Sequence, residues 1–230
     1  MNIKVNHEET VKLLKKVGES VCGLYEKGNE FVEKIKGMEN NSLYSEDGID
    51  SFVKQYTEQL NAEVKKFIED TEKDMEQAYT IEEENNKIVP LDDVELQNAL
   101  NIIKLMGNNI DVEVKQGIID RYKGYYQAQL LIEKMFDSMD VKYESFKVNV
   151  AMAIKTLLNY MKLKEECSPQ YVCEKMAVAM ESINLIYDEL GVNGDELITL
   201  PDGVYEIRLI HEASKIVYSM QGTSGVKNFF

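Results

Sequence analysis

The chain has 230 residues, of which 44% are hydrophobic, so it is long enough to bury a substantial core. Its formal net charge of -15 disfavours direct binding to nucleic acid, because such binding needs Lys and Arg to neutralise phosphates. Three cysteines without a CxxC pair indicate a reducing compartment rather than a disulfide framework. No apolar run has signal-peptide or membrane-spanning length, so we predict a soluble protein with no cleavable signal peptide, no transmembrane segment and no membrane partner.

Helix is the dominant predicted structure. The chain has only three prolines, and its abundant Glu, Lys, Leu, Ile and Met favour helices over strands. We predict a predominantly all-α fold, in which a long antiparallel helical hairpin accompanies a helical bundle and one small C-terminal β-hairpin. The predicted units are an N-terminal helical hairpin at 1–88, a small three-helix unit at 89–140, and a helical pair with the β-hairpin and a last helix at 141–230.

The first predicted helix begins at Asn6, with Glu9 three residues later as in a capping box. Its apolar residues repeat at spacings of three and four, which is typical of a coiled-coil seam. The seam consists of Leu14, Val17, Val21, Leu24, Phe31, Ile35 and Met38. Gly28 interrupts it, and this glycine indicates either the close approach of another helix or a locally softened turn.

A polar loop, NSLYSEDGIDSF at 41–52, follows the first helix. Asp50 or Ser51 is the predicted cap of the second helix, whose apolar residues repeat about every eleven residues. Such a repeat favours a straight helix, so the two helices are expected to form an antiparallel hairpin with the loop at its exposed tip. Leu43 and Tyr44 are the apolar side chains of that tip and are predicted partner contacts.

Three short helices are predicted in the middle of the chain. Asp92 caps the first, which ends at Gly107. The side chains predicted to face inward are Val94, Ala99, Leu100, Ile103 and Met106. A second helix restarts at Asp111 and reaches Gly124, and a third covers about 126–138.

The C-terminal part predicts two more helices, at 142–165 and 169–190. Ser168 caps the second of them and Pro169 occupies its first position, where a missing N–H costs nothing. An alternating pattern around Pro-Asp-Gly at 201–203 then predicts a β-hairpin. A last helix is expected near 209–220.

Negative charge gathers in two stretches. Residues 69–84 hold eight acids and one lysine, and residues 176–207 hold seven acids and no Lys or Arg. Such patches increase solubility, and they also serve to recognise partners. Together with the hairpin tip and two terminal aromatics, they supply these predicted contact residues: Leu43, Tyr44, Glu69, Asp70, Glu72, Asp74, Glu82, Glu83, Glu84, Asp195, Glu196, Phe229 and Phe230.

No motif points to catalysis. His7 and His211 are the only histidines, and neither they nor the cysteines have the spacing of zinc ligands. Residues 188–200 do not fit a calcium-binding loop, because Leu200 occupies the position where such a loop needs a bidentate carboxylate. We therefore predict a protein that is not an enzyme and has no cofactor, metal or catalytic residue.

Residues 43–139 resemble helical proteins encoded by tailed phages of low-GC Gram-positive bacteria. The resemblance lies in LYSEDGIDSFVKQYTEQLNAEVKKF, and then in LQNAL, a Gly-Asn break and a helix ending in a Lys-Gly step. It implies a role in virion structure or assembly, as a scaffold, capsid-associated or minor structural protein. The implied partners are capsid or other virion proteins, with self-association also expected, and the implied location is the host cytoplasm or the virion.

Two alternatives remain open. The hairpin and the YxxxE pattern of Tyr79 and Glu83 resemble the W-x-G and L-x-G substrates of type VII secretion, but Glu46 stands where the turn glycine belongs. In the other alternative, the acidic patches mimic nucleic-acid phosphates and inhibit a host nucleic-acid-binding protein.

Overall fold

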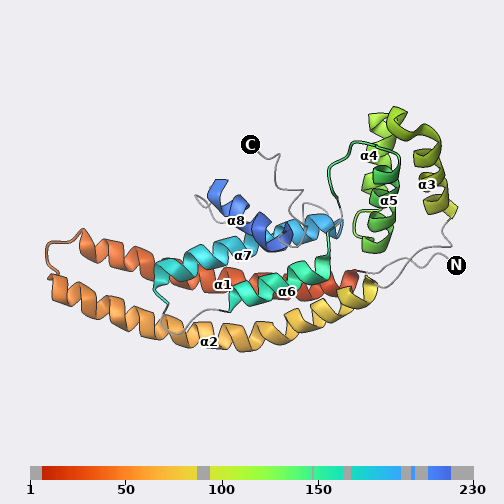
Figure 1. The fold of residues 1–230 in the computed structure, drawn as a ribbon. Helices are drawn as coiled ribbons and strands as arrows, with labels where there is room; N and C mark the ends of the chain where they lie inside the picture. The colour runs from red at the N-terminus through yellow and green to blue at the C-terminus, as the bar shows by residue number, and fades with distance from the viewer. Residues whose placement is uncertain are drawn as a thin grey trace.

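The computed structural model describes residues 7–86, 94–146, 148–162, 167–192, 198–199 and 207–218. Every regular element in these residues is helical, which confirms the all-α class (Figure 1). The α-helices are α1 (Glu8–Glu39), α2 (Glu46–Asn85), α3 (Val94–Met106), α4 (Val112–Arg121), α5 (Tyr126–Ser138), α6 (Val150–Met161), α7 (Pro169–Glu189) and α8 (Ile207–Tyr218), and a 3-10 turn, η1 (Gly107–Asn109), joins α3 to the segment before α4.

The two longest helices form the predicted antiparallel hairpin. The seam of α1 is buried at Leu14, Val17, Val21, Leu24 and Phe31. On α2, Leu60 and Val64 are among the buried residues that follow the eleven-residue repeat. The sequence pattern therefore predicted the facing sides of both helices correctly.

Helices α6, α7 and α8 pack on one side of this hairpin. α7 lies along α1, while α6 contacts α2 and α8 covers α6 and α7 (Figure 1). One cluster of buried side chains runs through all five helices, and Met176 and Ile183 of α7 are fully buried within it. The predicted units at 1–88 and 141–230 therefore share a hydrophobic core.

Helices α3, α4 and α5 surround a second, separate cluster of buried side chains, which includes Ile132 and Phe136. Within this cluster the buried residues of α3 are Leu96, Ala99 and Ile103. Two side chains predicted to face inward, Val94 and Met106, are instead exposed, and Leu96 takes the inward position. The prediction was wrong because α3 carries apolar side chains on more than one face, so periodicity alone does not select the buried one.

The start of α2 also differs from the prediction. The helix begins at Glu46, and the cap is Ser45 rather than Asp50 or Ser51. The Ser45 hydroxyl accepts a hydrogen bond from the Gly48 amide at 3.2 Å, which satisfies one of the free donors of the first turn. Acids at the next two positions further stabilise a helix start, because they lie at the positive end of the helix dipole.

The predicted helix at 142–165 begins eight residues later, at Val150. In the segment before α6, a buried carboxylate takes a backbone donor that a helix would otherwise use. Glu133 of α5 accepts hydrogen bonds from the Phe146 amide at 2.9 Å and the Ser145 hydroxyl at 2.8 Å. The Asn149 side chain then caps α6 by accepting from the Met152 amide at 3.1 Å. At α7, by contrast, Ser168 caps and Pro169 starts the helix as predicted.

The predicted β-hairpin falls mostly on residues outside those described. α8 begins at Ile207, two residues earlier than predicted. Asp92, the predicted cap of α3, and Asn6, the predicted cap of α1, also lie outside the described residues.

Candidate protein-interaction site

The distal part of the α1–α2 hairpin projects beyond the rest of the bundle (Figure 1). Gly28 lies against the first turn of α7, where a Cβ would come within 2.9 Å of the Cys173 Sγ and 3.4 Å of the Pro169 carbonyl oxygen. Gly28 is therefore a site of close helix approach. Beyond it the chain continues as a two-helix arm that ends in the tip region, which we define as residues 37–53.

The turn at the end of the arm is held by Asn41. Its side-chain oxygen accepts from the Leu43 amide, and its carbonyl accepts from the Tyr44 amide, both at 3.1 Å. This double contact presents Leu43 outward, with 87% of the residue exposed, and leaves Tyr44 41% exposed. Both predicted contact residues are therefore accessible, and the larger apolar exposure belongs to Leu43.

A row of aromatic rings connects the tip to the buried seam. Tyr44 contacts Phe52 edge-on at 6.1 Å between centroids, and Phe52 lies 6.3 Å from Tyr56. Tyr56 in turn stacks on the buried Phe31 at 4.8 Å, and the Lys34 ammonium lies 5.7 Å from the Phe31 ring centre. Aromatic and cation contacts of this kind each stabilise by about 1 kcal/mol, so they hold the arm in shape without a third helix.

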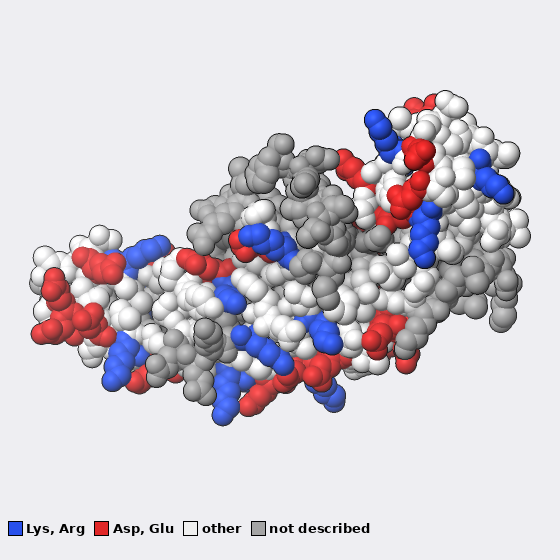
Figure 2. All heavy atoms as spheres, viewed as in Figure 1, with Lys and Arg blue, Asp and Glu red and all other residues white. Residues whose placement is uncertain are grey.

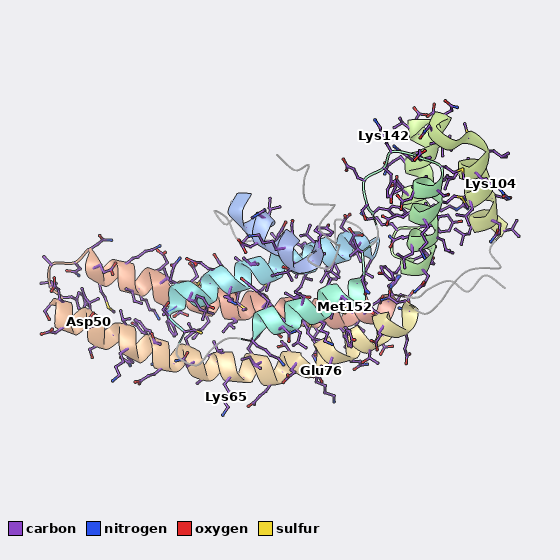
Figure 3. All side chains as sticks on the ribbon, in the orientation of Figure 1. Asp50, Lys65, Glu76, Lys104, Lys142 and Met152 are labelled. Atoms are coloured by element: carbon purple, nitrogen blue, oxygen red, sulfur yellow. The ribbon has the colours of Figure 1, made fainter. Side chains whose placement is uncertain are left out.

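The tip region carries only negative charge. It contains Glu39, Glu46, Asp47 and Asp50 and no Lys or Arg. Figure 2 shows acidic side chains gathered at the free end of the hairpin, and Figure 3 places Asp50 there. The tip therefore combines an exposed apolar centre with an acidic rim.

The acids of the stretch at 69–84 differ from one another in exposure and in ion pairing. Lys16 of α1 pairs with Asp74 at 2.6 Å, and Lys162 pairs with Glu72 at 2.7 Å. The remaining predicted contacts of this stretch that are exposed are Glu69, Asp70, Glu83 and Glu84. Neighbouring lysines thus neutralise part of the patch.

Glu82 is buried and stabilises the fold through hydrogen bonds. It is only 1% exposed, which is incompatible with the direct partner contact that we predicted for it. Its carboxylate accepts from the Thr10 hydroxyl at 2.6 Å and from the Asn85 amide at 3.2 Å, and His7 Nδ1 lies 3.0 Å from both of its oxygens. This buried network joins the start of α1 to the end of α2.

A second group of polar contacts lies where the three-helix unit meets the end of α7. Lys123, just after α4, pairs with Asp188 at 2.8 Å. The neighbouring Glu189 is buried, and burial raises the pKa of its carboxyl to about 7. The Tyr218 hydroxyl of α8 donates to Glu189 at 3.4 Å. None of these contacts has a sequence signature, because each depends on residues far apart in the chain.

The other predicted contact residues, Asp195, Glu196, Phe229 and Phe230, lie outside the described residues. Within the part of the chain that the structure describes, no group of three or more His, Cys, Asp or Glu side chains is arranged to hold a metal ion. In the same part, no helix is long and apolar enough to cross a membrane. Burial raises the pKa of the Cys173 thiol to about 11, which makes it a poor nucleophile.

No known protein family, curated protein or solved structure matches the chain.

Proposed function

We propose that this chain is a non-enzymatic phage protein that acts in virion assembly or structure by binding another protein through its hairpin tip. The observation that carries the proposal is the exposure of Leu43, 87% of which is accessible at the end of a braced two-helix arm. A large apolar side chain ringed by acids suits a partner surface with an apolar pocket and a basic rim. The resemblance of residues 43–139 to phage proteins supplies the biological setting.

The arm suits repeated, reversible contacts. In the arm α1 continues from Gly28 to Glu39, about 17 Å of helix, so the tip can reach a partner while the body of the protein stays clear of it. The acidic rim would speed encounter with a basic surface and make binding sensitive to salt. Both properties fit a scaffold or capsid-associated protein that contacts many copies of a coat protein.

Site-specific photo-crosslinking tests the contact directly. A photoreactive residue at position 43 is expected to crosslink to one virion protein in phage-infected cells. The matched control is position 65, an outward-pointing site on α2 away from the tip (Figure 3). Crosslinks of equal yield at both positions, or none at position 43, would contradict the tip as the contact.

Mass spectrometry tests the phage setting separately. Purified virions and empty precursor shells are compared, and the chain is expected in at least one of them. Absence from both would overturn the assembly role even where the tip crosslinks to some other protein.

Two alternatives have less support. In the secretion alternative, Tyr79 and Glu83 form the export signal; their side chains bond to each other at 2.7 Å, and the Lys155 ammonium lies 5.0 Å from the centre of the Tyr79 ring. A signal covered in this way would be less available to a receptor, and unchanged export of Tyr79→Ala would remove this alternative. The phosphate-mimic alternative is weakened by the lysines that pair with Glu72 and Asp74.

A further inference from the structure

Helix α3 has a second stripe of side chains that its own unit leaves uncovered. Leu96, Ala99 and Ile103 face the core, and on the opposite side of the helix four residues spaced by four, three and four positions are all exposed. These four residues, which we call the α3 stripe, are Val94, Asn98, Asn101 and Leu105. Such spacing is that of a coiled-coil seam, and large apolar side chains at the positions of a seam are normally buried against a second helix.

The ends of the stripe are strongly exposed. Val94 is 69% accessible and Leu105 is 86% accessible, although both are large apolar side chains at seam positions. α3 also forms the outer edge of its unit, away from the α1–α2 hairpin (Figure 1). Another helix can therefore reach the stripe without displacing any described part of the molecule.

Charge argues for a second copy of this chain as the occupant. The stripe contains no charged residue, and α3 as a whole carries only Glu95 and Lys104, which cancel. Two copies of a chain with a net charge of -15 repel each other over most of their surface, and a neutral stripe reduces that repulsion. The hairpin tip, with four acids and no base, would instead repel its own copy.

The order of residues in the stripe is self-complementary. It reads apolar, Asn, Asn, apolar in both directions, as an interface about a two-fold axis requires. In an antiparallel pair, Leu105 lies opposite Val94 of the second copy and Asn101 lies opposite Asn98 of the second copy. Paired asparagines in a seam fix its register, because any shift leaves their amides facing apolar side chains.

The flanking charges are compatible with the same arrangement. Glu95 pairs with Arg121 of α4 in its own chain, and the two Lys104 residues are separated by roughly 13 Å along the helix axis, so the pair brings no like charges into contact. We propose that the α3 stripe is a self-association surface, through which two copies of this chain pair by antiparallel α3 helices. The resulting dimer presents two hairpin tips, so a partner with several binding sites would gain avidity without any new contact.

The oligomeric state of the full chain tests the proposal. Multi-angle light scattering after size exclusion is expected to show a dimer whose dissociation constant rises about tenfold or more in Leu105→Asp. The fold should be unaffected, since Leu105 is almost fully exposed, and an unchanged melting temperature of the helical circular dichroism signal checks this. Leu43→Asp is the matched control, because it places the same change at the hairpin tip and should leave the dimer intact.

Cysteine pairing tests the orientation of the helices. A mixture of Val94→Cys and Leu105→Cys chains is expected to form a disulfide-linked heterodimer under mild oxidation, while neither variant links to itself through the new cysteine. Linkage of Val94→Cys to itself would overturn the antiparallel arrangement. A monomeric wild type, or a dimer that Leu105→Asp does not weaken, would overturn the stripe as a self-association surface and leave it to a different protein.

Discussion

The Sγ of Cys173 in α7 fills the space that a side chain would need at Gly28 of α1. A Cβ at position 28 would lie 2.9 Å from that sulfur, closer than real Cβ contacts allow. Cys173 is held in place because it is buried and its thiol donates weakly to the Tyr25 carbonyl oxygen at 3.7 Å. This pair of residues sets the distance between α1 and α7 at the base of the projecting arm.

Replacement of Gly28 should therefore destabilise the protein. Gly28→Ala forces Cys173 or α7 to move, at a cost of about 1–3 kcal/mol, which outweighs the gain of about 1 kcal/mol in helix propensity. Gly23→Ala is the control: it lies in the same helix with no atom within 4 Å of the added Cβ, and it should stabilise. Urea unfolding monitored by circular dichroism measures both changes in the free energy of unfolding.

A double mutant separates this contact from a general effect on α1. In the background of Cys173→Ala the sulfur is gone, so Gly28→Ala should cost less than it does in the wild type. If the two changes add without coupling, the close contact does not limit the approach of the helices.

Glu82→Ala should cost about 2–4 kcal/mol of stability. The substitution leaves the Thr10 hydroxyl and the Asn85 amide without their buried acceptor, and unpaired buried donors are costly. Glu84→Ala, two residues further along α2 but exposed, is expected to change the free energy of unfolding by less than about 0.5 kcal/mol. Similar losses in both variants would mean that the buried network contributes little.

The raised pKa of the Glu189 carboxyl predicts that the stability of the protein depends on pH. Burial raises the pKa of its carboxyl from its ordinary value of 4.5 to about 7 in the folded protein, so the folded state favours the protonated form. The corresponding stability is fully present below pH 4.5 and is lost as the pH rises to about 7. The loss is on the order of 3–4 kcal/mol, because each pKa unit corresponds to about 1.4 kcal/mol.

Glu189→Gln keeps the shape of the side chain but removes its titration. The difference in unfolding free energy between wild type and this variant should therefore change between pH 5 and pH 8, with the wild type losing relative stability as the pH rises. Glu113→Gln, at an exposed position of α4, should show no such change. A constant difference between wild type and Glu189→Gln across this range would contradict the raised pKa.

Leu43→Ala is expected to leave the free energy of unfolding within about 0.5 kcal/mol of wild type, because the side chain is 87% exposed. Phe31→Ala, at the buried end of the same aromatic row, should cost about 3–5 kcal/mol. Thermal melts of the two variants measure the contrast. A strongly destabilised Leu43→Ala would show that this side chain supports the fold and would weaken the case for a partner contact.

The sequence predicted the buried apolar face of the first long helix well, but it predicted the residues at which some helices begin poorly. The seam of α1 and the start of α7 followed from spacing and from Ser168-Pro169, because both signals lie within one helix. The start of α2 was missed because Ser45, Asp50 and Ser51 are all good caps, and only the backbone decides among them. The late start of α6 depends on Glu133, a carboxylate twelve residues before Ser145.

The candidate site was predicted in part for the same reason. Leu43 and Tyr44 were found because an apolar pair in a polar loop is visible in the sequence. The burial of Glu82 was not, because its partner Thr10 lies 72 residues away in the chain. The acids of 69–84 were grouped by sequence, whereas lysines from α1 and from the end of α6 neutralise some of them in the fold.

The contact between Gly28 and Cys173 also divides α1 into two parts that should differ in local unfolding. On the body side of that contact, amides of α1 are covered by α7, and their hydrogen exchange should require global unfolding. On the arm side, α2 is the one helix among the described residues that packs on them, so protection factors should fall steadily from position 28 toward the tip. A partner that binds Leu43 and Tyr44 would then reveal itself by slowing exchange along the whole arm, even where it touches none of those amides.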